Sequence, residues 1–202
     1  MAKPTRLTQD MIDAYVAQGL WDGQGIGDIL RQNAARWPDR EAVVDSSHRY
    51  SWSGLNRVVN AVAVNLLKMG MGRDQTLVAQ IPTSTHTVIL LLACHKAGIL
   101  CCFPPMTFRH KELTHILKTL NAAAVVSPME YRSTDYLGMV KEIEPDLPEL
   151  KHFILMADHA PEGALPLAEL MNPDPGVEDP EEYLGPFGFS PFEVSMVVLS
   201  SG

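Results

Sequence analysis

Residues 76–103 decide the fold, and they read TLVAQIPTSTHTVILLLACHKAGILCCF. Residues 76–81 are a short apolar run that is typical of a buried strand, and residues 84–95 are apolar on nearly every side, which predicts a helix buried between two layers. Residues 99–103 form a second apolar run. A strand, a helix and a second strand joined by short turns predict a right-handed parallel crossover.

The pattern extends toward the N-terminus as one long amphipathic helix. Its apolar side chains recur at the three-and-four spacing of a single helical face, and they are Leu55, Val58, Val59, Val62, Ala63, Leu66 and Leu67. Ser53 is the expected N-cap, and Gly70 is the expected stop after the last turn. Ahead of this helix, residues 41–45 and 48–52 predict a hairpin that turns at Ser46 and Ser47.

The pattern also continues toward the C-terminus. Helices are expected at residues 110–120 and 136–143, and strands at residues 123–127, 153–156 and 195–199. The alternation predicts an α/β fold with a parallel-dominated, doubly wound sheet flanked by helices. Its core should bury five leucine and valine side chains, which are Leu55, Val62, Leu66, Leu91 and Leu117.

Composition limits the function classes. The chain has 202 residues, 46% of them hydrophobic, and a formal net charge of −8, which argues against nucleic acid as a partner. Met1 to Asp10 has no apolar core of a secretory signal, and the longest apolar run, residues 88–94, is too short to span a bilayer. We therefore expect a cytoplasmic protein that does not enter a membrane.

Most of the negative charge lies in one region. Residues 142–182 hold twelve acidic side chains and one base, Lys151, and seven prolines fall between residues 157 and 191. An acidic stretch with many prolines predicts a solvated connection across the surface. The organisation expected along the chain is N-terminal helices and a hairpin at 1–52, an α/β subdomain at 53–156, an acidic, proline-rich connection at 157–193, and a strand with the start of a loop at 194–202.

The three cysteines, Cys94, Cys101 and Cys102, lie in apolar surroundings without the spacing of a zinc site, and Cys101 and Cys102 should face opposite sides of a strand. They are interpreted as buried free thiols.

The histidines do not predict a metal site. His110 and His115 are five residues apart, which is not metal-ligand spacing on one helical face, and His86, His95 and His152 have no carboxylate or cysteine partner nearby in sequence. All five are interpreted as surface or helix-end residues.

The last residues, 194–202, are an apolar run that breaks into Ser200-Ser201-Gly202. Such a turn can place several backbone N–H groups around an anion, and glycine lets the backbone approach it closely. The same three residues are also typical of an ordinary turn.

Six segments, taken in order, resemble the N-terminal part of adenylate-forming enzymes, the superfamily of acyl-CoA and aryl-CoA synthetases, aryl-acid adenylating enzymes and luciferases. They are the opening residues 19–31, RWPDREAVVD at 36–45, YSWSGLNR at 50–57, KAG at 96–98 followed by PP at 104–105, RHKEL at 109–113, and VVLSSG at 197–202. Gly54 stands where many members have Glu, and residues 101–103 replace a run of small apolar residues. Neither departure touches a segment that carries chemistry.

The resemblance implies the N-terminal portion of the large domain of a ligase. Such an enzyme uses ATP and Mg²⁺ to convert a small carboxylic acid to an acyl-adenylate, then transfers the acyl group to coenzyme A. Ser200, Ser201 and Gly202 would open the loop that grips the β- and γ-phosphates. The lysine of that loop, the central nucleotide-binding motifs and the C-terminal lysine domain do not occur in these residues. We therefore expect a fragment that is inactive alone, with no catalytic residue and no metal ligand.

The resemblance favours an aryl or alicyclic acid as the substrate, on the basis of Gly19-Leu20-Trp21 and residues 135–140. An aryl-acid adenylating enzyme that loads a carrier protein is the alternative, and a stand-alone, non-catalytic binding domain is a second. Assembly as a homodimer stays open.

Two other enzyme classes do not fit. A dinucleotide-binding domain needs Gly-x-Gly-x-x-Gly after its first strand, and residues 82–86 read PTSTH, without glycine. Paired catalytic carboxylates, Ser-His-Asp arrangements and Gly-x-Ser-x-Gly are absent as well, so the sequence does not indicate a hydrolase.

Overall fold

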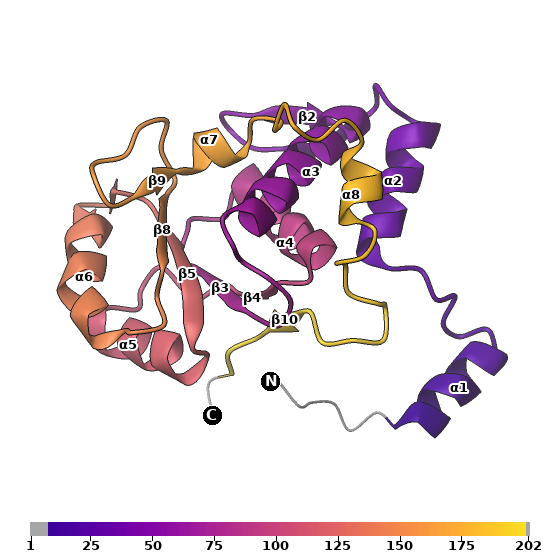
Figure 1. Cartoon of the computed structure of the whole chain (residues 1–202), viewed down its shortest axis with the longest axis horizontal. Coiled ribbons are helices and arrows are strands. Elements are labelled where there is room, and N and C mark those ends of the chain that lie inside the picture. The colour runs from indigo at the N-terminus through magenta and orange to yellow at the C-terminus, as the bar shows by residue number, and fades with distance from the viewer. Residues whose placement is uncertain (1–7, 201–202) are drawn as a thin grey trace.

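A parallel sheet forms the centre of the molecule in the computed structural model, which describes residues 8–200 (Figure 1). Its strands, in spatial order, are β10 (Met196–Val197), β4 (Leu100–Cys102), β3 (Thr76–Ala79), β5 (Ala122–Ser127), β8 (His152–Leu155) and β9 (Leu165–Pro166). Every neighbouring pair is parallel. The predicted parallel α/β sheet is confirmed.

Helices cover both faces of this sheet, as Figure 1 shows. One layer contains α2 (Ile26–Arg36), α3 (Trp52–Lys68), α4 (Thr85–Ala97), α7 (Leu167–Leu170) and α8 (Pro180–Leu184), and the other contains α5 (His110–Thr119) and α6 (Tyr136–Ile143). Alternation along the strands divides the core between the layers. In β3, Leu77 and Ala79 pack with the α3 and α4 layer, and Val78 packs with the α5 and α6 layer.

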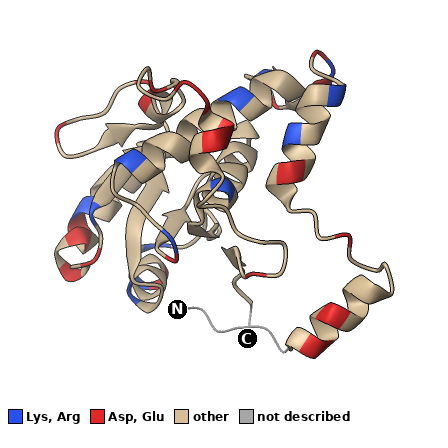
Figure 2. Cartoon of the chain, turned by 45° about the vertical axis from the view of Figure 1, so that its right-hand side comes forward, with Lys and Arg blue, Asp and Glu red and all other residues tan. Residues whose placement is uncertain are grey.

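The remaining elements lie outside the sheet. They are α1 (Gln9–Ala17), the antiparallel pairs β1 (Glu41–Val44) with β2 (Arg49–Ser51) and β6 (Glu130–Tyr131) with β7 (Thr134–Asp135), and a 3₁₀ turn at Glu144–Asp146. Helix α1 buries none of its residues and stands apart from the sheet. It carries acidic and no basic side chains (Figure 2). Between residues 8 and 200, no helix combines the length and the apolar character that crossing a membrane requires.

The start of α3 corrects one prediction. Ser51, not Ser53, is the N-cap, because its Oγ accepts the Gly54 N–H at 3.2 Å and the helix begins at Trp52. Ser53 is already inside the first turn, where its Oγ donates to the carbonyl of Pro38 at 2.9 Å. The sequence offers a serine on either side of Trp52. Ser51 becomes the cap because it is the last residue of β2, so the helix starts directly after it. The stop at Gly70 is confirmed by its φ of 88°.

The predicted core is nearly all buried. Leu55, Val62, Leu66 and Leu117 are buried, while Leu91 is half-buried and packs against the same core.

The cysteine interpretation is also confirmed, because all three cysteines are free and buried. Burial raises the pKa of Cys101 to about 12 and the pKa of Cys102 to about 11. It raises the pKa of Cys94 well above the ordinary thiol value. The neutral thiols therefore behave as small apolar side chains.

The acidic segment after β8 is less solvated than predicted. Leu167, Leu170 and Leu184 are buried in the layer that contains α3 and α4. Asn65 of α3 donates to the carbonyl of Leu170 at 2.9 Å, which fastens the segment to that helix. Composition misled the prediction because a few leucines at the right positions anchor a segment whose other residues remain in water.

Candidate functional site

The carboxyl edge of the sheet is the candidate site. Strand order β4-β3-β5-β8-β9 matches the doubly wound order 2-1-3-4-5. In such sheets ligands bind outside the carboxyl ends of the strands, where the connections diverge to opposite faces. Here that point lies between β3 and β5, because α4 follows β3 in one layer and α5 precedes β5 in the other.

Unpartnered polar atoms gather at this edge. Among the described residues, five buried side-chain atoms have no hydrogen-bond partner, and they are Gln80 Oε1, Ser84 Oγ, Thr85 Oγ1, His86 Nδ1 and Ser127 Oγ. All five belong to the segment that follows β3 or to the last residue of β5. A buried polar group left unpaired costs about 1–3 kcal/mol. Their common location makes this edge rich in buried polar groups that can accept or donate hydrogen bonds.

Gln80 links two strand ends at this edge. It is fully buried directly after β3, and its backbone N–H donates to Val126 of β5 at 2.9 Å. Its Nε2 donates to the carbonyls of Pro105 and Phe108 at 2.9 and 3.0 Å, which holds the loop after β4. With both amide donors engaged there, Oε1 is left as a free acceptor.

Of the three predicted phosphate-loop residues, the structure describes only Ser200. Strand β10 runs parallel to β4, with Met196 opposite Cys101 and Val197 opposite Cys102, so the chain leaves β10 toward the carboxyl edge. Ser200 follows and is exposed. Ser201 and Gly202 lie outside the described residues.

Asp45 anchors the β1–β2 turn to the first residue of α4. Its Oδ1 accepts the backbone N–H groups of Ser47 and His48, both at 2.7 Å, and its Oδ2 accepts the N–H of Thr85 at 2.8 Å. The N–H groups of Thr85 and Ser47 hold the pKa of Asp45 well below its usual range. The carboxylate is therefore charged and held from three directions.

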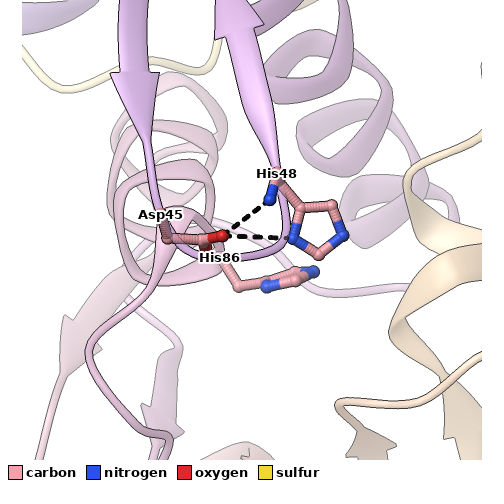
Figure 3. Close-up of side chains that lie close together, drawn as sticks. All are labelled: Asp45, His48 and His86. Atoms are coloured by element: carbon pink, nitrogen blue, oxygen red, sulfur yellow. Dashed lines mark hydrogen bonds and ion pairs between the residues drawn. The ribbon is translucent and has the colours of Figure 1, made fainter.

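Two histidines join Asp45 (Figure 3). His48 Nδ1 lies 3.5 Å from Asp45 Oδ1, and the His48 and His86 rings stand nearly perpendicular with centroids 5.0 Å apart. Burial and the neighbouring His48 lower the pKa of His86, and Asp45 opposes that shift. One ligand atom from each of the three residues lies within 4.8 Å of the other two.

The helix-end interpretation of His86 is confirmed, and the structure adds a contact that the sequence does not reveal. The residue does lie in the first turn of α4, as expected, but a carboxylate from the distant hairpin turn faces it. No spacing along the chain reveals the contact, because tertiary packing brings Asp45 and His86 together. His110 fits the surface interpretation, since it is exposed and pairs with Glu142 at 2.8 Å.

Lys96 forms a second buried polar cluster at the opposite end of α4. Its side chain is 7% exposed, and Nζ donates to Asn56 Oδ1 at 3.0 Å, Asn60 Oδ1 at 2.6 Å and Glu181 Oε1 at 2.8 Å. Both amides also donate to Glu181 Oε1. Burial lowers the pKa of Lys96, and the Glu181 carboxylate opposes that shift. Because every donor of the ammonium is paired, Lys96 has no free donor, and the cluster fastens α8 to α3 and α4.

Comparison with known proteins identifies the family of the chain. Residues 30–196 match the family described as AMP-binding enzyme. The chain is 28% identical over 161 residues to the 2,3-dihydroxybenzoate-AMP ligase of Bacillus subtilis (strain 168), a match that covers 80% of this chain and 30% of that protein. It is 27% identical over 164 residues to the 2-hydroxy-7-methoxy-5-methyl-1-naphthoate–CoA ligase of Streptomyces carzinostaticus, with coverage of 81% and 29%.

A solved structure shares the fold. The apo structure of Mycobacterium smegmatis MbtA has a TM-score of 0.81 and 24% identity, and the match covers 98% of this chain and 35% of that one.

The chain spans 30% and 29% of the length of the two curated relatives described above. The family match extends over most of the chain and confirms the resemblance seen in the ordered motifs. The chain belongs to the AMP-binding enzyme family.

Proposed function

We propose that this chain is the N-terminal portion of the large domain of an ATP-dependent carboxylic acid ligase. In the first step the carboxylate attacks the α-phosphorus of ATP, giving an acyl-adenylate and releasing pyrophosphate. In the second step the thiol of coenzyme A attacks the acyl carbon, giving a thioester and releasing AMP. The observation that carries the proposal is the family match over residues 30–196, together with a parallel β10 that leads Ser200 toward the carboxyl edge.

The first step brings two anions together, so it requires directed positive charge and N–H donors. Mg²⁺ would supply charge at the phosphates. The backbone N–H groups of Ser200, Ser201 and Gly202 would form the first part of the phosphate loop. The unpartnered atoms of Gln80 and Ser127 lie at the carboxyl edge, toward which β10 runs. The whole reaction is assigned to a protein of the relatives' length, and we expect the 202 residues alone to make no acyl-adenylate.

An aryl acid is the proposed substrate class. The names of both relatives cited above contain an aromatic acid, a dihydroxybenzoate in one and a naphthoate in the other. For the acceptor we propose coenzyme A, which the second name includes. A carrier protein is the alternative acceptor, since the first name specifies only the adenylate.

Carboxylate-dependent exchange of labelled pyrophosphate into ATP is the test for the first step. It is run on a protein that includes this chain at the relatives' length, with hydroxybenzoates, a naphthoate and octanoate as acids. Exchange with the aromatic acids and not with octanoate supports the proposal. Equal exchange with octanoate overturns the substrate class, as does no exchange with any of the aromatic acids, and the ligase itself is overturned if an alicyclic acid added to the panel also gives no exchange. Release of AMP on addition of coenzyme A, and not on addition of a carrier protein, decides the acceptor.

The coding sequence after Gly202 separates the ligase from a stand-alone binding domain. Continuation into residues similar to Thr-Thr-Gly-x-Pro-Lys completes the phosphate loop and supports the ligase. A stop codon directly after Gly202 supports the non-catalytic domain.

A further inference from the structure

The cluster of Asp45, His48 and His86 has the composition of a transition-metal site. Imidazole nitrogen and carboxylate oxygen together suit zinc, whereas magnesium and calcium favour oxygen ligands. The residues come from two elements, the β1–β2 turn and the first turn of α4 (Figure 3).

The distances are close to those that a zinc ion requires. Zinc binds nitrogen and oxygen at about 2.0–2.2 Å, so ligand atoms around a four-coordinate ion lie roughly 3.4 Å apart. One nitrogen from each histidine and one carboxylate oxygen of Asp45 lie within 4.8 Å of one another. Side-chain rotations that shorten the longest distance between two ligand atoms by about 1.4 Å would reach that ideal spacing.

Lone pairs remain for a cation on two of the three side chains. His86 Nδ1 is buried and has no hydrogen-bond partner among the described residues. Asp45 Oδ2 accepts one N–H, from Thr85, and an ionised carboxylate oxygen can accept more than one. The three backbone N–H groups on Asp45 orient the carboxylate, which is the role that outer-sphere hydrogen bonds have around metal ligands.

The histidines also line a pocket of about 410 Å³, which has apolar walls from Met156 and Leu167 and one carboxylate, Asp158. With three protein ligands, a four-coordinate ion keeps one position open to this space. We propose that Asp45, His48 and His86 form a zinc-class metal site whose open coordination position faces this pocket. The bound ion would cross-link the β1–β2 turn to the start of α4. This inference does not rest on the ligase function.

Metal binding tests the proposal directly. The chain, free of any polyhistidine tag and treated with chelator, is titrated with Co²⁺ and then with Zn²⁺. We expect one equivalent of Co²⁺ to produce the visible absorption of a low-symmetry cobalt site, and Zn²⁺ to displace it. His48→Gln and His86→Gln should each weaken Zn²⁺ binding by about 100-fold or more, beyond the 10- to 100-fold loss that removal of an outer-sphere partner causes. Zn²⁺ should also raise the melting temperature of the wild-type chain and of neither variant.

His115→Gln is the matched control, because His115 is an exposed histidine of α5 in the other helical layer. It should bind Zn²⁺ as the wild type does. Circular dichroism of the His48 and His86 variants without metal establishes that they remain folded. Failure of the wild-type chain to bind Co²⁺ or Zn²⁺ saturably overturns the proposal. So does Zn²⁺ affinity that falls equally in His115→Gln and His86→Gln, or that changes in none of the variants.

Discussion

The buried pair of Lys96 and Glu181 allows a sharp test of how α8 is held. Lys96→Met and Glu181→Leu each leave both Asn56 and Asn60 with one unpaired amide group, so the two variants differ mainly in the charge that remains. Glu181→Leu leaves an ammonium whose side chain is 7% exposed, and Lys96→Met leaves a carboxylate whose side chain is 30% exposed. The buried ammonium cannot reach water easily, whereas the carboxylate can.

The expected losses follow from that difference. Removing one partner of a buried pair costs about 3–5 kcal/mol, and we expect Glu181→Leu to fall in this range. The cost of burying the unpaired Lys96 charge in this variant cannot exceed about 4.6 kcal/mol at pH 7. At a higher cost, a lysine with an ordinary pKa of about 10.4 releases its proton and becomes neutral. Lys96→Met should cost about 2–3 kcal/mol, because Glu181 regains water but the amide oxygens stay unpaired. The double variant should cost less than the sum of the two by about 1–3 kcal/mol.

Urea unfolding at pH 7, followed by circular dichroism, measures these free energies for the wild type, both single variants and the double variant. A matched cycle uses Lys118→Met and Asp146→Leu, whose side chains are 51% and 71% exposed and whose charged atoms are 3.9 Å apart. Its coupling should be below about 1 kcal/mol. The reasoning is refuted if Lys96→Met costs more than Glu181→Leu, or if the coupling of the buried pair is no larger than that of the exposed pair.

Three further predictions concern pH, backbone conformation and thiol reactivity. Burial raises the pKa of Glu181, but the hydrogen bonds to its carboxylate outweigh burial, so the folded-state pKa is lowered. The contribution of the Glu181 carboxylate to folding stability is therefore complete above the unfolded pKa of about 4.3 and is lost as pH falls through the lower folded value. The urea midpoint of Glu181→Gln should accordingly fall less between pH 6 and pH 3 than that of the wild type. Gly98→Ala should lower the melting temperature more than Gly23→Ala. Both glycines have positive φ, but only at Gly98 would an added Cβ meet a backbone oxygen, the carbonyl oxygen of Phe187, at 2.4 Å. Equal shifts in melting temperature would contradict this. The three buried cysteines should resist a thiol reagent at pH 8 and all react in urea, because burial raises their pKa values; rapid labelling of the folded chain would show that they are accessible.

Local patterns in the sequence determined the elements and the way they connect. Residues 76–103 specify a buried strand, a buried helix and a second strand, and each appears in the structure within a few residues of its predicted bounds. Apolar spacing predicts these elements because a helix or strand must bury one face or both, and the spacing shows which faces are buried. Short connections and the handedness of crossovers then leave few topologies other than a parallel sheet.

Only the tertiary structure decided which distant polar groups meet. The sequence could not place β10 beside β4, choose Ser51 over Ser53 as the cap, or bring Asp45 to His86 and Glu181 to Lys96. Such contacts depend on how whole elements pack, and a single polar side chain leaves no periodic trace along the chain. The gathering of unpartnered polar atoms at the carboxyl edge has the same origin, since the ends of β3 and β5 become neighbours only when the sheet forms.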